Sequence, residues 1–437
     1  MYTACSSTPK LRSSLTSPTK QLTDKLLRFI PLMLTPAQAL EAILAHATPL
    51  PARSLPLDEC AGEILRESLC ADRPFPPFDR VSMDGVAVCS AAFTGSALVE
   101  GLCPAGTPRK ALIYRANALE VMTGAVLPEG CDTVIPVEWI RREDDRIVLS
   151  DDQALQPGQF VHRAGSDLPA GAPILHPGVR LLAPQIAVAA TLGKTRIEVS
   201  TRPRIQIVTT GDEIVPVFAS PLPHQIRSSN SHALATSLVL AGFDQPELRQ
   251  LDDERAVLET GLNTALAGAD VLLITGGVSA GAFDFVPEAL ARAGAETVFH
   301  KVAQRPGKPM LFARGPAGQL VFGLPGNPLS CLVCLHRYVL PALFRLMGAG
   351  LRSAPVAVRL GAGFSCDDQL TLFKLASIEQ GIATPLNASG SGDLVTPARS
   401  DGFVELPSGC GAAEGSWFPF HSWSNPSAWI DEAGRKP

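Results

Sequence analysis

The sequence VLLITGGVSAGAFD, from Val271 to Asp284, decides the central fold. A short apolar and β-branched run is followed at once by two glycines. Such a run is typical of a buried strand, and the glycine-rich turn is expected to lead into a helix. The segment from Ile205 to Thr209 repeats this pattern and is followed by TGDEI. The two stretches predict strand–loop–helix units of an α/β domain.

The pattern extends on both sides of these strands. Helices are predicted at about 232–241, 254–267, 285–293 and 328–347, and a further strand runs from Leu320 to Gly323. Strands that alternate with helices at this spacing indicate a parallel α/β sheet. Outside this region, Thr35 and Pro36 fit the N-cap and first position of a helix that ends near His46. The segment that follows, up to about residue 164, is rich in Pro, Gly and short strand-like runs, which indicates a β-rich module. A helix is expected at 184–192. Short strands are predicted again after residue 349.

Composition narrows the class of protein. The chain has 437 residues, 46% hydrophobic and 18% charged, with a net charge of −5. Its length indicates several folded domains, and the acidic balance argues against a nucleic-acid partner. No apolar stretch is expected to reach the length that crosses a bilayer, so no membrane partner is expected. Residues 1–32 are Ser/Thr-rich and basic, and we interpret them as a disordered tail or a start assigned too early, with Met33 as the true start, rather than a targeting peptide.

The ten cysteines are scattered, unlike those of a small disulfide-rich domain. Cys331 and Cys334 form a C-x-x-C within an apolar helical run. No second pair accompanies them. We therefore interpret them as a buried helix face and not as a metal or redox site.

Ligands of an open parallel sheet bind beyond the carboxyl ends of its strands. The loop TTGDEI places Asp212 and Glu213 there, where paired acids suit a hard cation such as Mg²⁺; a helix cap or a solvated turn is the alternative. In TGGVSAGAFD, Gly276 and Gly277 allow close backbone approach to an anion. Asp284, at the next helix start, is either a functional residue or a simple cap.

Two further loops suit an oxyanion. RPGKP brings Arg305 and Lys308 around a Pro-Gly turn, with a solvated charged turn as the alternative. In GLPGNPLS, Asn327 could cap a helix that begins at Pro328, and Ser330 would lie in its first turn near free N–H groups. The sequence has neither a P-loop nor a dinucleotide-binding fingerprint. The loops therefore predict a site for a phosphate-bearing ligand and a divalent cation.

These loops, in this order, resemble the MoeA/gephyrin-E family of molybdopterin molybdenumtransferases, from about Met33 to Pro419. Upstream segments also resemble the family's motifs: PPFDRVSMDGVAV (Pro76 to Val88), VMTGAVLPEGCDTVIPVE (Val121 to Glu138) and HRAGSDLPAG (His162 to Gly171). This chain has Ser228 where the family has an acid, and Lys374 where it usually has Arg.

The resemblance implies a multidomain α/β plus β protein. It implies a linking domain (33–52 and 165–202), an inserted β-rich domain (53–164), a central parallel, MogA-like α/β molybdopterin-binding domain (203–350), a C-terminal β-barrel (351–424) and a tail (425–437). It also implies a cytoplasmic homodimer whose cleft lies between the α/β domain of one subunit and the β domains of the other.

The resemblance further implies the site residues. The catalytic set is Asp84, Thr123, Asp167, Glu213, Asp252 and Asp284, with Glu213 and Asp284 as metal ligands. The ligand-binding set is Gly276, Gly277, Ser279, Arg305, Lys308, Pro309, Asn327, Ser330, Lys374 and Ser391.

The implied reaction transfers molybdate to adenylylated molybdopterin with Mg²⁺ and releases AMP. Molybdopterin adenylyltransferase and cofactor-accepting molybdoenzymes are the partners it suggests. The rival functions are the adenylyltransferase of the neighbouring step, a non-catalytic pterin- or oxyanion-binding paralogue or scaffold, and a generic sugar-phosphate or nucleotide enzyme. The first is disfavoured by GGVS in place of that family's GGTG, and the second by the acids and lysine retained around one cleft.

Overall fold

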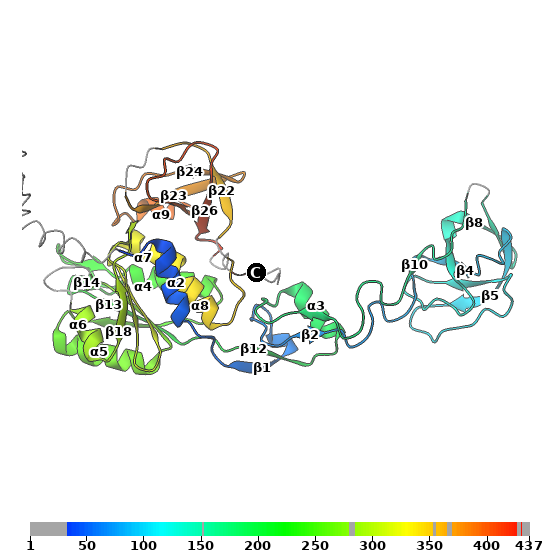
Figure 1. Cartoon of the computed structure of the whole chain (residues 1–437), viewed down its shortest axis with the longest axis horizontal. Helices are drawn as coiled ribbons and strands as arrows, with labels where there is room; N and C mark the ends of the chain where they lie inside the picture. The colour runs from blue at the N-terminus through cyan, green and yellow to red at the C-terminus, as the bar shows by residue number, and fades with distance from the viewer. Residues whose placement is uncertain are drawn as a thin grey trace, which may run out of the picture. The chain divides into compact units, whose positions relative to one another are not determined.

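A computed structural model describes residues 33–150, 153–278, 285–352, 355–364, 369–425 and 430 (Figure 1). The predicted tail, residues 1–32, lies outside this range. The chain divides into two compact units. Unit 1 comprises Met1–Ala47, Pro203–Ala342 and Ala354–Ala428; unit 2 comprises Thr48–Arg202, Leu343–Ser353 and Trp429–Pro437.

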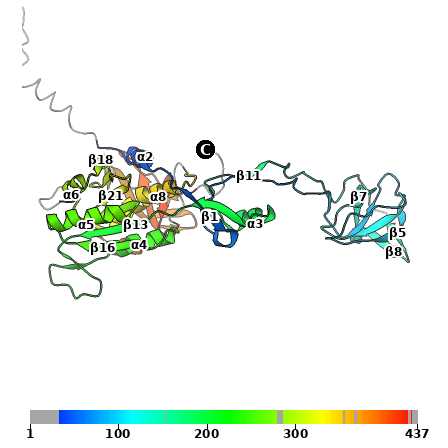
Figure 2. The same ribbon diagram turned by 90° about the horizontal axis from the view of Figure 1, so that it is seen from below.

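The centre of unit 1 is a six-stranded α/β sheet. Its strand order is β16 (Glu247–Leu251), β13 (Ile205–Thr210), β17 (Val271–Thr275), β21 (Leu320–Leu324), β20 (Leu311–Arg314) and β18 (Glu296–His300). The helices are α4 (Asn230–Leu240), α5 (Arg255–Gly268), α6 (Val286–Arg292) and α7 (Pro328–Cys334). Helices α4 and α5 lie on opposite faces of the sheet near β13 (Figure 2). The predicted α/β domain is confirmed.

The sheet is not wholly parallel, which corrects the sequence-based prediction. Strands β16, β13, β17 and β21 run parallel, whereas β20 is antiparallel to both β21 and β18. A short turn at Gly315–Gly318 joins β20 to β21. Because a parallel crossover needs about a dozen residues, so short a connection requires an antiparallel pair.

The long helix predicted at 328–347 contains a π-helical turn. α7 passes into a π-helical segment, Leu335–Val339, and then into α8 (Leu340–Leu346). Contrary to the expectation from sequence, this 19-residue helix is long and apolar enough to cross a membrane by length and composition, but 89% of its apolar window is buried within the protein. Such burial is also found in the core helices of globular proteins.

The C-terminal part of unit 1 is a closed β-barrel, as the resemblance implied. Its strands are β22 (Ala357–Leu360), β23 (Thr371–Glu379), β24 (Ile382–Pro385), β25 (Gly402–Leu406) and β26 (Trp417–Ser422). Strand β23 pairs with both β24 and β25, which closes the ring through β22 and β26. Strand β19 (Gln304–Arg305) pairs with β23 and joins the barrel to the α/β chain.

Unit 2 is rich in β-structure, as predicted. One sheet has the order β7 (Thr133–Pro136), β4 (Gly85–Val88), β6 (Ala118–Val121), β5 (Ser96–Cys103), β9 (Arg146–Leu149) and β8 (Ile140–Glu143). Three two-stranded pairs join β1 (Ala52–Pro56) with β12 (Arg196–Ser200), β2 (Leu69–Cys70) with β11 (Pro173–Leu175), and β3 (Arg80–Val81) with β10 (Val161–His162). Helix α3 (Ala183–Thr191) matches the predicted helix within one residue at each end.

The first described helix, α2 (Pro36–His46), belongs to unit 1. Its N-cap is Thr35, as predicted, and Gln38 completes a reciprocal capping box. The local sequence therefore determines where this helix begins.

Candidate functional site

The loops singled out in the sequence meet at one edge of the α/β sheet. In the parallel register, Thr209 of β13 lies opposite Thr275 of β17, and Thr275 lies opposite Leu324 of β21. Because these strands run in the same direction, their following loops emerge side by side. The TTGDEI, TGGVS and GLPGNPLS loops are thereby brought together.

A cleft of about 890 Å³ opens between these loops. We call it the strand-end cleft. Of the predicted site residues, it is lined by Glu213, Gly276, Gly277, Pro309 and Asn327. Thr209, Asn230 and Thr275, which were not among the predicted site residues, also line it.

Gly276 and Gly277 are required by the packing of neighbouring strand ends. Both have positive φ, 97° and 64°. A Cβ on Gly276 would lie 2.5 Å from the carbonyl oxygen of Thr210, and one on Gly277 would lie 2.7 Å from Val286. Only glycine fits both the conformation and the space. Because both glycines line the cleft and have no side chain, a ligand bound there could lie close to their backbone, as predicted.

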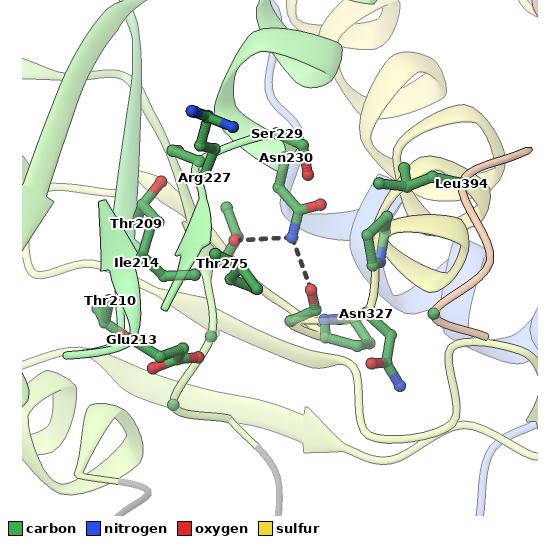
Figure 3. A pocket seen from close by; sticks show the side chains of 18 of the residues that line it. Thr209, Thr210, Glu213, Ile214, Arg227, Ser229, Asn230, Thr275, Asn327 and Leu394 are labelled. Carbon is green, nitrogen blue, oxygen red and sulfur yellow. Dashed lines mark hydrogen bonds between the residues drawn. The ribbon is translucent and has the colours of Figure 1, made fainter. Parts of the chain in front are cut away.

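Asn230, at the start of α4, is bonded to two of the strand ends that border the strand-end cleft (Figure 3). Its Nδ2 donates to the carbonyl oxygen of Gly326 at 2.7 Å and to the hydroxyl of Thr275 at 3.3 Å. The start of α4 is thus tied to the ends of β17 and β21. The sequence signal at this position was Ser228-Ser229-Asn230, which resembles the D-S-N step of the family.

The acids of the TTGDEI loop do not act as a pair. Glu213 lines the strand-end cleft, whereas the Asp212 carboxylate accepts a hydrogen bond of 3.1 Å from the backbone N–H of Asp253. Asp212 instead holds the loop after β16, so of the two acids it is Glu213 that lines the cleft. Asp252 is exposed on that loop and is not among the residues lining the cleft. Ser279 and Asp284 lie outside the described residues.

A second cavity, of about 730 Å³, shares Pro309, Pro325 and Asn327 with the strand-end cleft. Among the described residues, its charged lining side chains are all cations: Arg305, Lys308 and Lys374. We call it the cationic cavity. The hydroxyl residues Ser330 and Ser391 also line it. Three cations and two hydroxyl donors suit a compact oxyanion.

Lys374 comes from β23 of the barrel, and its Nζ donates to Asn387 at 2.6 Å. The same Nζ lies 5.5 Å from the centre of the Phe364 ring. The cationic cavity is therefore built from both the α/β chain and the barrel.

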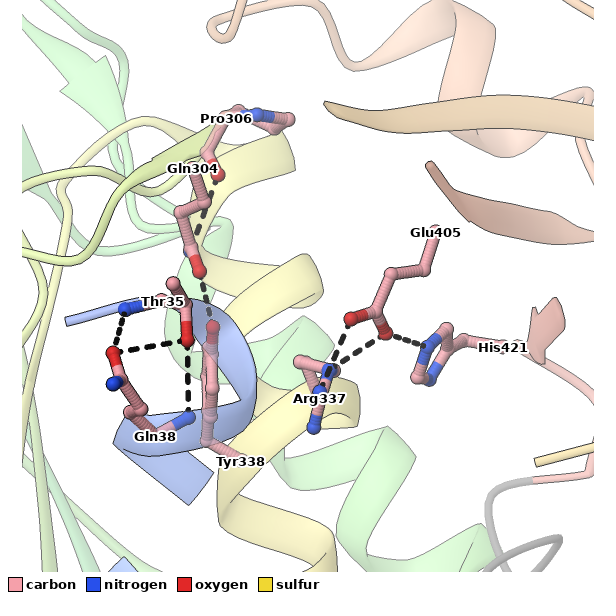
Figure 4. A network of polar contacts seen from close by, with 8 residues as sticks. All are labelled: Thr35, Gln38, Gln304, Pro306, Arg337, Tyr338, Glu405 and His421. Atoms are coloured by element: carbon pink, nitrogen blue, oxygen red, sulfur yellow. Dashed lines mark hydrogen bonds and ion pairs between the residues drawn. The ribbon is translucent and has the colours of Figure 1, made fainter. Parts of the chain in front are cut away.

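The RPGKP loop is supported from beneath by buried polar contacts (Figure 4). Tyr338, in the π-helical segment, donates a hydrogen bond to Gln304, and Gln304 Nε2 donates to the Pro306 carbonyl at 3.2 Å. Gly307 has φ 92°, and a Cβ there would lie 2.6 Å from Gln304 and 2.8 Å from the Cys334 sulfur. This packing fixes the loop through which Arg305 and Lys308 line the cavity.

A second buried network joins the same helix to the barrel (Figure 4). Arg337 Nε lies 2.7 Å from Glu405, and His421 Nε2 lies 3.1 Å from the same carboxylate. Burial tends to raise the pKa of Glu405, but the hydrogen bond from His421 and the charge of Arg337 outweigh it and the pKa is lowered. Burial lowers the pKa of His421 despite the nearby Glu405. The π-helical segment thus links the RPGKP loop with the barrel.

Asn327 occupies the N-cap position of α7 but does not cap it with its side chain. Its Nδ2 donates instead to the hydroxyl of Ser391 at 2.7 Å, and the backbone N–H of Leu329 donates to the Ser391 carbonyl at 3.2 Å. The capping interpretation is therefore wrong for the Asn327 side chain. Two predicted ligand-binding residues, far apart in sequence, are in direct contact.

The remaining predicted catalytic residues belong to unit 2. The backbone N–H of Thr123 donates to Asp84 at 2.6 Å, and this bond together with the Thr123 hydroxyl lowers the pKa of Asp84. Asp167 lies 2.8 Å from His162 Nε2, whose other ring nitrogen lies 3.2 Å from Arg80. Asp84 and Thr123 thus form one contact pair, and Asp167 belongs to another polar group.

Cys331 and Cys334 are buried in α7, and burial raises the pKa of Cys334 to about 12. No metal-binding group of three or more His, Cys, Asp or Glu residues occurs within the described part of the chain. The structure therefore supports the interpretation of this C-x-x-C as a buried helix face.

Comparison with known proteins agrees with this architecture. Residues 34–193 match the model of the MoeA N-terminal region (domain I and II), and residues 206–345 match that of the "Probable molybdopterin binding domain". The chain is 39% identical to a molybdopterin molybdenumtransferase of Synechocystis over 90% of this chain and all of that protein. It is 30% identical to one of Bacillus subtilis, over 81% of this chain and 85% of the relative. The crystal structure of the molybdopterin biosynthesis moeA protein from Pyrococcus horikoshii OT3 aligns with a TM-score of 0.76, at 26% identity, over 89% of this chain and 99% of the other.

The two matched domains and the molybdenumtransferase relatives show that this chain is an enzyme of molybdenum cofactor biosynthesis. More specifically, the chain belongs to the molybdopterin molybdenumtransferase family.

Proposed function

We propose that this enzyme transfers molybdate to adenylylated molybdopterin and releases AMP. The observation that carries the proposal is the pair of adjoining cavities in unit 1 that share Pro309, Pro325 and Asn327. The cationic cavity is lined by three cations and no described acid, and the strand-end cleft is lined by Glu213. A dianion and a phosphate-bearing ligand would then bind next to each other, which is what the transfer requires.

Molybdate is proposed to bind in the cationic cavity. Arg305 and Lys308 would offset its charge, and Lys374 would approach from the barrel side. Ser330 and Ser391 would donate hydrogen bonds to its oxygens. The molybdenum would leave the site on the dithiolene sulfurs of the pterin, which are its soft ligands.

Mg²⁺ is proposed to bind at Glu213 and Asp284. A single described carboxylate in the strand-end cleft suits Mg²⁺, which is often held by one or two carboxylates together with water and substrate phosphates. When bound, the cation would polarise the phosphorus–oxygen bond that is cleaved to free AMP. Glu213 would hold it at the end of β13, beside the loop that contains Gly276 and Gly277.

We also propose that the enzyme acts in the cytoplasm as a homodimer and that Asp84, Thr123 and Asp167 take part in the reaction. Light scattering coupled to size exclusion would report the mass of the assembly, and a monomer would contradict the dimer.

The reaction is tested by AMP release from purified protein given adenylylated molybdopterin, Mg²⁺ and molybdate, with molybdate omitted as control. AMP release that depends on molybdate is expected. Tight binding of the substrate with no release under any condition would contradict catalysis and indicate a binding protein.

A further inference from the structure

The side-chain amide of Asn230 is held in one orientation. Its Nδ2 donates to the carbonyl oxygen of Gly326 and to the hydroxyl of Thr275. An amide nitrogen has two hydrogens, so these two bonds use both. Turning the amide over would place Oδ1 against the Gly326 carbonyl, an acceptor facing an acceptor. The observed orientation is therefore enforced by its neighbours.

This orientation presents the Asn230 carbonyl oxygen to the strand-end cleft. The side chain lines the cleft, and Figure 3 shows its oxygen turned away from both hydrogen bonds, toward the side where Leu394 lies. An acceptor fixed in this way needs no reorganisation to bind a ligand N–H or O–H group.

Thr209 contributes a second polar atom to the same cleft. Its residue is 4% exposed, and within the described residues its hydroxyl oxygen is buried without a hydrogen-bond partner. Thr209 lines the cleft and lies opposite Thr275 in the β13–β17 register. Buried polar groups are nearly always hydrogen-bonded in native proteins, and Thr209 lines the cleft, so a ligand bound there is the candidate partner for this hydroxyl.

We infer that Asn230 and Thr209 are substrate-recognition residues of the strand-end cleft. Asn230 Oδ1 accepts a hydrogen bond from the ligand, and the Thr209 hydroxyl pairs with a neighbouring polar atom of it. The matching chemistry is the polar edge of a heterocycle or sugar, which carries donors and acceptors side by side. The inference rests on the proposed function, in which both the pterin and the adenosine of the substrate offer such an edge.

The test measures binding separately from turnover, in full-length protein. Adenylylated molybdopterin and AMP are titrated calorimetrically into the wild type and into Asn230→Ala, Thr209→Val and Thr209→Ser. Valine keeps the shape of threonine without its hydroxyl, and serine keeps the hydroxyl. Thr264→Val is the matched control, because the Thr264 hydroxyl bonds only to the Thr260 carbonyl within α5 among the contacts described.

Asn230→Ala and Thr209→Val are each expected to weaken binding of adenylylated molybdopterin about tenfold, and to raise KM by a larger factor than they lower kcat. Thr209→Ser and Thr264→Val should bind as the wild type does. Equal weakening for AMP would assign the contacts to the adenosine edge, and unchanged AMP binding would assign them to the pterin edge. A residue that only supported the fold would lower the thermal unfolding midpoint without this split between KM and kcat.

Wild-type affinity in both Asn230→Ala and Thr209→Val would overturn the inference. If Asn230→Ala does not fold, the comparison of Thr209→Val with Thr209→Ser decides. Normal AMP release with unchanged affinities would remove the recognition role and leave the proposed reaction intact. If the wild type releases no AMP but the variants bind the substrate more weakly, the proposed reaction is wrong and the recognition role stands.

Discussion

Asn327, at the start of α7, donates a hydrogen bond of 2.7 Å to the hydroxyl of Ser391, which belongs to the barrel region of the chain. Both residues line the cationic cavity, and Asn327 also lines the strand-end cleft. The bond therefore lies where the two cavities adjoin. Asn327, which the sequence left as a possible helix cap, thus contacts a second predicted ligand-binding residue in the proposed site.

Replacement of Ser391 by Ala should raise the molybdate concentration needed for half-maximal AMP release by about threefold to tenfold, since one hydrogen bond is lost. The thermal unfolding midpoint should change little, because the bond is exposed. Molybdate titration of AMP release measures the effect. Ser424→Ala, an exposed serine outside both cavities, is the control; an equal response in the two variants would contradict a role for Ser391.

Lys308→Ala should raise the molybdate requirement more strongly, by about tenfold or more, because a charge-assisted contact to a dianion is lost. The affinity for AMP should be nearly unchanged. Arg345→Ala removes a positive charge from an exposed site on α8 and serves as the control. Unchanged molybdate dependence would remove Lys308 from the oxyanion site.

Glu213→Gln should lower AMP release by about a hundredfold at saturating substrates and raise the Mg²⁺ concentration that is needed, because glutamine lacks the charge that holds the cation. Molybdate affinity should be retained, since Glu213 lines the strand-end cleft and is not among the residues of the cationic cavity. Mg²⁺ titrations at fixed molybdate separate the two effects. A normal Mg²⁺ response would show that the cation binds elsewhere.

The stability of the protein should fall with acid because of His336. Burial, with a smaller effect of His421, lowers the pKa of His336 to about 3. The folded state therefore keeps this ring neutral, while the unfolded chain binds a proton below about pH 6.5. The contribution of the neutral ring to the free energy of unfolding is complete above pH 6.5. It decreases as the pH falls, by about 2 kcal/mol between pH 7 and pH 5.

His336→Phe tests this prediction. Phenylalanine keeps an aromatic edge against Trp423, whose ring centre lies 4.9 Å from that of His336, and cannot titrate. Urea unfolding at pH 7 and pH 5 should show a smaller acid loss in His336→Phe, while exposed His224→Gln should behave as the wild type. An identical acid loss in His336→Phe would contradict the assignment.

Thiol labelling should distinguish the described cysteines by burial. Cys70 and Cys410 are exposed and should react rapidly in the native protein, whereas Cys331 and Cys334 are buried, with raised pKa values, and should react only after unfolding. Peptide mapping by mass spectrometry identifies the labelled sites. Rapid native labelling of Cys331 or Cys334 would argue for an accessible reactive site.

The local features of the fold follow from patterns that can be read along the sequence. β17 has the bounds that the apolar run predicted, β13 extends one residue further, and α2 begins at its predicted cap. Apolar patterns, glycine turns and helix caps depend on residues that are close together in the chain. Strand and helix positions can therefore be predicted from the order of the residues alone. The sequence also predicted that Glu213 and Lys308 lie on loops. Glu213 lines the strand-end cleft, and Lys308 lines the cationic cavity.

Which of the predicted site residues contact one another follows from the tertiary fold. The Asp212 carboxylate accepts a hydrogen bond from the loop that follows β16, Asn327 contacts Ser391, and the Thr209 hydroxyl is buried in the lining of the strand-end cleft. The π-helical segment likewise contacts residues distant in sequence, because Arg337 bonds to Glu405 and Tyr338 bonds to Gln304. Contacts between residues distant in sequence depend on strand register and packing, which no local pattern specifies, and the site is made of such contacts.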